Sequence, residues 1–152
     1  MAQQFTGLSY SYIFDGAGNM RDQLEQTILM ELQAKGYPLR AIIKEIKAGG
    51  LIFGTKEQCV VIEIDKESQI AISNTAVGSY LYVEAYLMIQ EKVSFFGAVF
   101  SALTDNVFKQ QKRNAVFMAA RQAMESAFGR LGLKQCNSGY DGEKNEIRNE
   151  AK

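Results

Sequence analysis

YLYVEAYLMIQ, residues Tyr80–Gln90, alternates between two kinds of side chain along its whole length. The apolar members of one set are Leu81, Val83, Ala85, Leu87 and Ile89. The other set is Tyr80, Tyr82, Glu84, Tyr86 and Met88. Because successive side chains of a strand point to opposite faces, this pattern predicts a β-strand with its apolar set facing a core and its tyrosine set facing outward.

Several stretches before Tyr80–Gln90 also resemble strands. Phe5–Phe14 alternates, and its predicted shared face consists of Leu8, Tyr10, Tyr12 and Phe14. Strands are also expected at Leu39–Ala48, Cys59–Ile64 and Gln69–Thr75, which are rich in β-branched residues. Gly49-Gly50 reads as a hairpin, with a short strand continuing over Leu51–Phe53, and Gly54–Gln58 as a turn or bulge. Connections this short favour antiparallel neighbours.

Two regions have helical spacing. Met20, Leu24, Ile28 and Leu32 recur every four residues, which predicts a helix at about residues 20–35. Asn19 is its expected N-cap, and Gly36 and Pro38 are expected to end it. Near the C-terminus, a second helical stripe consists of Phe108, Val116, Ala119, Ala120, Ala123, Ala127 and Leu131. Ser94–Leu103 is apolar nearly all round and out of phase with that stripe, so we expect two helices or one bent helix.

This order of elements predicts an α+β fold. Its antiparallel sheet has about five strands, with the early helix and a long, kinked C-terminal helix packed on one face. Residues 1–133 are expected to form a single domain, because the chain of 152 residues has no internal repeat or linker. Residues 134–152 are polar and lack aliphatic periodicity, so we expect a disordered polar tail there.

The composition argues against several classes of function. The chain contains no histidine and two cysteines, so serine–histidine and cysteine–histidine catalysis and ordinary zinc sites are not expected. We therefore predict no enzymatic activity, no cofactor and no metal. Acidic and basic residues number 17 each, which disfavours nucleic-acid binding. We expect neither a signal peptide nor a transmembrane segment, and a reducing, cytoplasmic location.

Three polar features are expected to be structural. The Asp15–Asn19 loop lacks a complete phosphate-binding fingerprint, because Arg21 stands where a third glycine would be needed. The acidic residues Glu63, Asp65 and Glu67 surround a turn, where water should solvate them. The basic residues expected to form a solvated face of the last helix are Lys109, Lys112, Arg113 and Arg130.

Two apolar or aromatic surfaces remain as candidate binding sites. One is the tyrosine set Tyr80, Tyr82, Glu84 and Tyr86, with Tyr10 and Tyr12 projecting in the same way from their own strand. The other is the apolar segment containing Phe95, Phe96, Val99 and Phe100. Tyrosine is enriched at protein interfaces, although cross-strand aromatic pairs can also simply stabilise a sheet.

The leading interpretation is a binding or assembly module, homo-oligomeric, that presents one of these surfaces to a protein partner. The alternative is a carrier or sensor of a small apolar ligand, with a pocket between the sheet and the phenylalanine-rich helix. Glu84 or a tyrosine would then orient the ligand.

Overall fold

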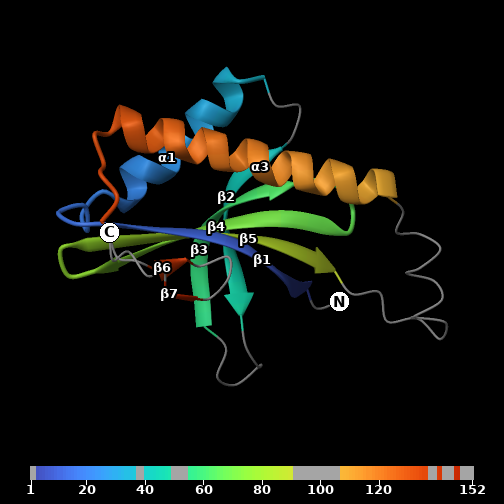
Figure 1. The fold of residues 1–152 in the computed structure, drawn as a ribbon, viewed down its shortest axis with the longest axis horizontal. Coiled ribbons are helices and arrows are strands. Elements are labelled where there is room, and N and C mark those ends of the chain that lie inside the picture. The colour runs from blue at the N-terminus through green and yellow to red at the C-terminus, as the bar shows by residue number, and fades with distance from the viewer. Residues whose placement is uncertain are drawn as a thin grey trace.

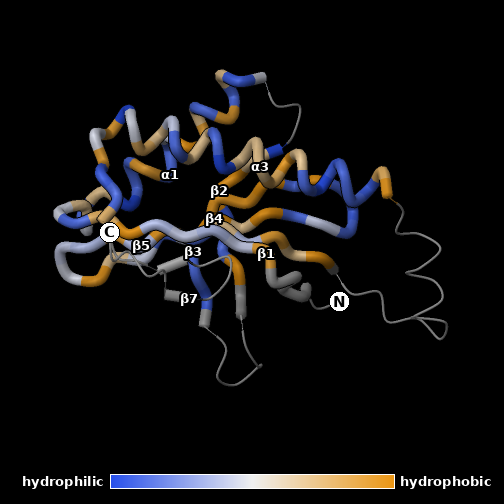
Figure 2. Tube along the Cα trace, in the orientation of Figure 1, coloured by the Kyte–Doolittle hydropathy of each residue, from blue (hydrophilic) through white to orange (hydrophobic). Residues whose placement is uncertain are grey.

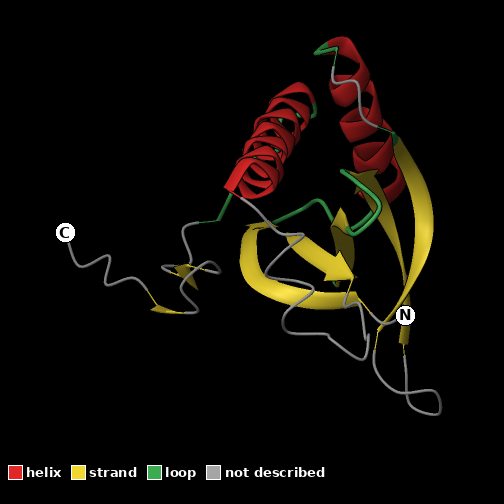
Figure 3. Ribbon diagram, turned by 90° about the vertical axis from the view of Figure 1, so that its right-hand side faces the viewer, coloured by secondary structure: helices red, strands yellow, loops and turns green. Residues whose placement is uncertain are grey.

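A computed structural model describes residues 3–36, 40–48, 55–90, 107–136, 140–141 and 146–147. Its elements in chain order are β1 (Gln3–Phe14), α1 (Arg21–Ala34), β2 (Ala41–Ala48), β3 (Thr55–Glu63), β4 (Ser68–Val77), β5 (Tyr80–Gln90), α3 (Val107–Arg130), β6 (Tyr140–Asp141) and β7 (Glu146–Ile147). Strands β1 to β5 form one antiparallel sheet in the order β1-β5-β4-β3-β2. Both helices lie on the same side of this sheet (Figures 1 and 3), which confirms the predicted α+β architecture.

Strand β5 has the predicted bounds and pairs with β1 on one side and β4 on the other. Its apolar set faces the helices: Leu81, Val83 and Ala85 are fully buried in the core. The opposite set is only partly buried at Tyr82, Glu84 and Tyr86. The apolar strands beneath the helices are visible in Figure 2. The alternation therefore predicts correctly which side chains of β5 face the core and which face the other side of the sheet.

Strand β1 corrects the prediction for its tyrosines. Tyr10 pairs with Ala85 and Tyr12 pairs with Val83, so both side chains share the helix-facing side of the sheet. The Tyr10 hydroxyl donates a hydrogen bond to the Phe117 carbonyl at 3.0 Å, and both tyrosines are buried. Tyr10 and Tyr12 are core residues, and their expected projection as a binding surface was wrong.

A register shift lies nearer the start of β1. Phe5 pairs with Met88 and Ser9 with Tyr86, so β1 carries an irregularity between these two pairs. Such a bulge interrupts strict alternation. Leu8 lies within it and is 47% exposed, whereas Tyr10 is buried, which contradicts the prediction that the two residues share one face.

Helix α1 matches its predicted range within a residue at each end. Leu24, Ile28 and Leu32 are buried, as their spacing predicts. The left-handed backbone at Gly36, with φ of 68°, follows the helix as expected. The N-cap is Met20, which makes no side-chain capping bond, so the assignment of Asn19 as cap was wrong.

Helix α3 buries a broader face than its predicted stripe. Ala120, Ala123 and Ala127 lie in the core as expected, and they are joined by Phe117, Met124 and Phe128. Phe108 is 75% exposed, so its place in the stripe was wrong. Ser94–Leu103 lies outside the described residues, so the kink expected between this segment and α3 stays a prediction.

Strand β3 begins earlier than predicted, because Thr55–Gln58 belongs to it rather than to a turn. These four residues pair with β2 in a hairpin whose last pair is Ala48 with Thr55. The residues expected at its tip, 49–54, lie outside the described residues.

Strands β3 and β4 separate partway along their length. Their ladder runs from Glu63 and Gln69 to Cys59 and Ser73. Beyond Cys59, β3 pairs with β2, whereas beyond Ser73, β4 pairs with β5. Within the described residues, the two hairpins thus diverge in a V (Figure 1), and we call the point of divergence at Gln58 and Asn74 the β3–β4 fork.

The segment after α3 returns to the edge of the sheet at β1. Gln135 forms a bridge with Phe14, and the Cys136 amide donates a hydrogen bond to the Ile13 carbonyl at 2.8 Å. Tyr140–Asp141 and Glu146–Ile147 pair with each other. The rest of the segment predicted as a tail, 137–139, 142–145 and 148–152, lies outside the described residues.

Candidate functional site on the open sheet face

The sheet face opposite α1 and α3, here called the open face, carries a row of small and polar side chains. Glu84 of β5 pairs with Ser11 of β1 and with Ser73 of β4. Ser73 in turn pairs with Cys59 of β3. In an antiparallel sheet, directly paired residues lie on the same face. The neighbouring row contains Ser9, Tyr86, Ala71 and Val61.

Glu84 is the centre of a hydrogen-bonded group on this face. The Tyr82 hydroxyl donates to Glu84 Oε2 at 2.9 Å. Burial raises the pKa of Tyr86 well above its ordinary value, and the hydrogen bond to Glu84 and the negative charge of that carboxylate raise it further. A hydrogen bond with Ser73 acts in the opposite direction. The two tyrosines are therefore oriented by one carboxylate, and Tyr86 stays protonated at neutral pH.

Three of the residues predicted as a site come together here, namely Tyr82, Glu84 and Tyr86. Tyr80 shares their face but pairs with Val77 beside the β4–β5 turn, where it is 42% exposed. The second predicted surface, with Phe95, Phe96, Val99 and Phe100, lies outside the described residues.

A pocket of about 350 Å³ opens next to this tyrosine–glutamate group. Its lining residues are Ile46, Glu57, Cys59, Ala71, Ser73, Tyr86 and Met88. Cys59 and Ala71 are small and buried, whereas Ile46 and Met88 are larger and only partly buried. Small residues on the central strands, flanked by large ones on β2 and β5, thus produce a hollow in the sheet surface. The register of β2, β3 and β4 brings these residues together, so the sequence pattern of each strand alone could not reveal the pocket.

Cys59 is the residue of this pocket with nucleophilic potential. Burial raises the pKa of its thiol to about 11, with smaller contributions from the charges of Glu57 and Glu25, against an opposing effect of Arg21. Since the thiolate is the reactive form, this cysteine is suited to packing rather than to nucleophilic chemistry at neutral pH.

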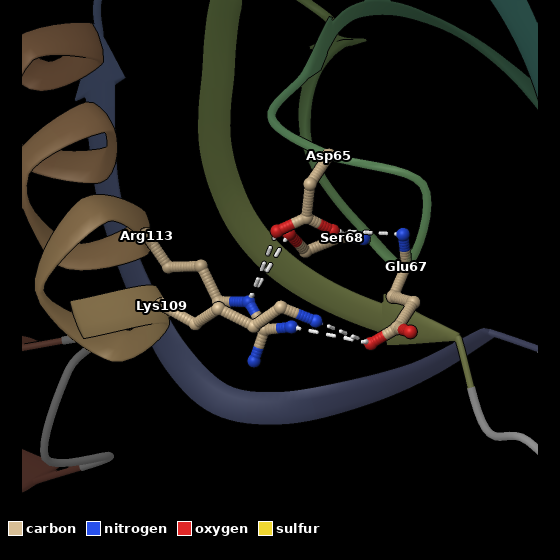
Figure 4. Close-up of polar contacts among 5 residues, drawn as sticks. All are labelled: Asp65, Glu67, Ser68, Lys109 and Arg113. Atoms are coloured by element: carbon tan, nitrogen blue, oxygen red, sulfur yellow. Dashed lines mark hydrogen bonds and ion pairs between the residues drawn. The ribbon is translucent and has the colours of Figure 1, made fainter. Parts of the chain in front are cut away.

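A separate ionic cluster joins α3 to the turn between β3 and β4 (Figure 4). Arg113 Nε lies 3.5 Å from Asp65 Oδ2 and donates a hydrogen bond to Ser68 Oγ at 3.2 Å, and Arg113 Nη2 lies 3.6 Å from Glu67 Oε2. Lys109 Nζ also lies 3.5 Å from Glu67 Oε2. Arg113 is only 3% exposed, so its predicted place on a solvated helix face was wrong. Its guanidinium instead pairs with the carboxylates that were expected to be solvated.

Asp65 stabilises the conformation of the turn that makes this contact. Its Oδ1 accepts hydrogen bonds from the backbone amides of Glu67 at 2.7 Å and Ser68 at 2.8 Å. Burial disfavours the charged form of Asp65, but these hydrogen bonds and the positive charge of Arg113 outweigh it and lower the pKa of the carboxyl. The cluster therefore holds α3 on the sheet, which is a structural role.

Among the described residues there is neither a cluster of metal-ligating side chains nor a membrane-spanning helix. In the part of the chain that the structure describes, no group of three or more histidine, cysteine or acidic side chains is placed to hold a metal ion. Neither α1 nor α3 is long and apolar enough to cross a membrane.

Comparisons with known proteins do not assign the chain to a family. No family model matches it, and neither does any curated protein. One similar solved structure is the open form of the exocytosis-sensitive phosphoprotein pp63/parafusin, a phosphoglucomutase from Paramecium. That similarity has a TM-score of 0.41 and 12% identity, and it covers 85% of this chain but 22% of the other.

Proposed function

We propose that this protein is a non-enzymatic binding module that uses its open sheet face to hold a protein partner. The observation that carries this proposal is the apolar pocket of about 350 Å³ beside the Tyr82–Glu84–Tyr86 group. The described helices pack on the other face of the sheet, so they do not cover this pocket (Figure 3).

The composition of the open face favours a protein partner. Aromatic residues and methionine are enriched at protein interfaces, and a pocket that receives one apolar side chain commonly supplies much of the binding energy. Tyr86 and Met88 border such a pocket here. Because Glu84 already orients the tyrosines, less side-chain entropy is lost when a partner binds.

The partner that we favour is a second copy of the chain, since symmetric homo-oligomers are the commonest assemblies of soluble proteins. Both described cysteines, Cys59 and Cys136, are free thiols, and we expect the protein to act in the reducing cytoplasm.

A small apolar ligand is the alternative occupant of the same pocket. The volume lies at the lower end of the range of about 300–1,000 Å³ that ligand pockets span. Cys59, Ala71 and Met88 supply an apolar lining, and Ser73 supplies a hydroxyl. This pocket is on the sheet face opposite α1 and α3. The phenylalanine-rich segment, which the sequence analysis expects to cover a ligand pocket, lies outside the described residues.

Sedimentation velocity over a range of protein concentrations tests the assembly. We expect the wild-type chain to associate and Met88→Glu to shift it towards monomer, because a charge beside the pocket would have to be desolvated in the contact. Met118→Glu is the matched control, since Met118 is 69% exposed on α3 and away from the open face.

A second measurement separates the alternative. If the wild-type chain stays monomeric at high concentration, homo-assembly is wrong. Binding of a fluorescent apolar dye that Met88→Glu weakens and Met118→Glu does not would then support the ligand site. Monomeric behaviour together with no dye binding would contradict both uses of the pocket.

A further inference from the structure

Asn74 is a fully buried polar residue on the helix-facing side of β4. Its side chain has no exposed surface, and neither its Oδ1 nor its Nδ2 has a hydrogen-bond partner among the described residues. Burying an amide without a hydrogen-bond partner is energetically costly, so native proteins rarely leave one unsatisfied. The residue therefore requires a partner other than the described side chains in their present arrangement.

The position of Asn74 at the β3–β4 fork explains why the sheet does not provide that partner. Ser73 is the last residue of β4 to pair with β3, and Asn74 follows it. Gln58 stands at the corresponding place on β3, one residue before Cys59. The two strands separate at these residues. Because their hydrogen-bonded pairing ends here, the side chains of Gln58 and Asn74 are not held next to each other by the sheet.

Beside the fork, α1 contributes a second incompletely satisfied group. Gln58 Nε2 donates a hydrogen bond to Glu25 Oε2 at 2.9 Å, and Glu25 is fully buried. Glu25 Oε1 has no hydrogen-bond partner among the described residues, although Arg21 Nε lies 3.3 Å away as an ion pair. The charge of Glu25 is thus balanced, while one of its oxygens can still accept a hydrogen bond.

The fork also connects the helix layer with the open face. Arg21 Nη2 donates a hydrogen bond to the Gln58 carbonyl at 3.3 Å. The same atom lies 3.7 Å from Oε2 of Glu57, a residue that lines the pocket on the open face. The pKa of Cys59, another pocket residue, is influenced by the charges of both Glu25 and Arg21. Polar groups at the fork therefore act on the pocket wall from the opposite side of the sheet.

We propose that the β3–β4 fork contains a specific binding site for one internal water molecule, held by the Asn74 carboxamide. A water molecule can donate and accept at once, which Asn74 Oδ1 and Nδ2 together require. The occupant must be small because Asn74 has no exposed surface. It must be neutral because Arg21 already balances Glu25. The site is independent of the proposed binding function.

A high-resolution crystal structure of the full chain tests the site directly. We expect a solvent peak within hydrogen-bond distance of Asn74 Oδ1 or Nδ2. A direct hydrogen bond from the Asn74 carboxamide to Gln58 or Glu25, with no solvent between them, would overturn the proposal. In solution, magnetisation transfer from a long-lived water to the Asn74 side-chain amide protons is the corresponding signal, and its absence counts against the site.

Replacement of Asn74 distinguishes a bound water from an unsatisfied side chain, because the two predict opposite changes in the midpoint of urea unfolding. If water is bound, Asn74→Val removes one of its partners and lowers the midpoint of urea unfolding. If Asn74 is simply unsatisfied, the same variant removes that cost and raises the midpoint or leaves it unchanged, which refutes the site. Thr75→Val, at the exposed next position of β4, is the control for β-propensity and should not lower the midpoint.

Discussion

Arg113 of α3 is held 3.5 Å from Asp65, which lies in the turn between β3 and β4. The arginine side chain is 3% exposed and the aspartate side chain 22% exposed, so solvent reaches the pair from the acidic side. Glu67 and Ser68 complete the contact. Helix α3 is thereby fixed to the sheet by an ionic contact as well as by apolar packing.

Arg113→Met should destabilise the protein by about 2–4 kcal/mol, somewhat less than the loss of one partner from a fully buried ion pair. The variant keeps the apolar stem but leaves Asp65 and Glu67 without their shared cation. Urea unfolding followed by circular dichroism measures the change. Lys109→Met is the matched control: its side chain is 35% exposed, and it should cost less than about 1 kcal/mol. Equal effects of the two variants would mean that burial of Arg113 contributes nothing.

The stabilising effect of Asp65 should depend on pH. Folding lowers the pKa of its carboxyl, so the carboxylate stabilises the native state at pH values above its unfolded pKa of about 3.9. That contribution is lost as the pH falls through the unfolded pKa and then the lower folded pKa. Asp65→Asn should therefore be less stable than wild type at neutral pH, with a difference that shrinks in acid. Urea midpoints at a series of pH values would show this convergence, and a constant difference would contradict it.

The sequence predicts the central strand and the apolar side of α1 well, because both have uninterrupted periodicity. It fails at Arg113 because charge alone indicates a solvated position, whereas the two acceptors lie in a turn far away in the chain. The alternation along β1 shows that Tyr10 and Tyr12 share a face, but it does not say which face of the sheet that is. Only the pairing of β1 with β5 assigns them to the core.

The sequence does not predict the pocket, for a related reason. It combines Ile46 of β2 with two residues each from β3, β4 and β5, and of these only Tyr86 is a site candidate in the sequence. Register between strands is set by tertiary packing, which a single strand's pattern does not specify.

The two faces of β5 should respond differently to truncation. Leu87 is 2% exposed in the core, and Leu87→Ala should cost about 2–5 kcal/mol. Tyr82→Ala removes a larger but partly exposed side chain from the open face, and it should cost less in the monomer. Chemical denaturation at low protein concentration makes the comparison. Equal losses would show that both faces are covered.

Glu84→Gln should lower the pKa of Tyr86 towards its ordinary value, because the substitution removes a negative charge that disfavours the tyrosinate. Spectrophotometric titration of tyrosinate absorbance at high pH would detect the earlier ionisation. Glu125→Gln is a matched control on the other face, where it should instead affect Tyr12, whose pKa is about 12. If Glu84→Gln leaves the titration unchanged, Glu84 does not control Tyr86.

The two thiols should differ in reactivity. Cys59 is 3% exposed and its pKa is raised to about 11, whereas Cys136 is partly exposed. An aromatic disulfide reagent at neutral pH should modify Cys136 rapidly and Cys59 only after unfolding. The Cys136→Ser variant isolates Cys59 for this measurement. Rapid modification of native Cys136→Ser would show that the pocket opens in solution.

The pairing of β1 with β5 also has a consequence for how the chain folds. Strands β2, β3 and β4 each pair with the next strand in sequence, so β2 to β5 can form progressively through local hairpins. Phe14, in contrast, must find Leu81, across α1 and three intervening strands. Closing so long a loop is entropically costly, and contacts of this kind slow folding. During synthesis, β1 leaves the ribosome before β5 and can pair only after β5 has emerged, so its tyrosine-bearing face is open to aggregation in the interval.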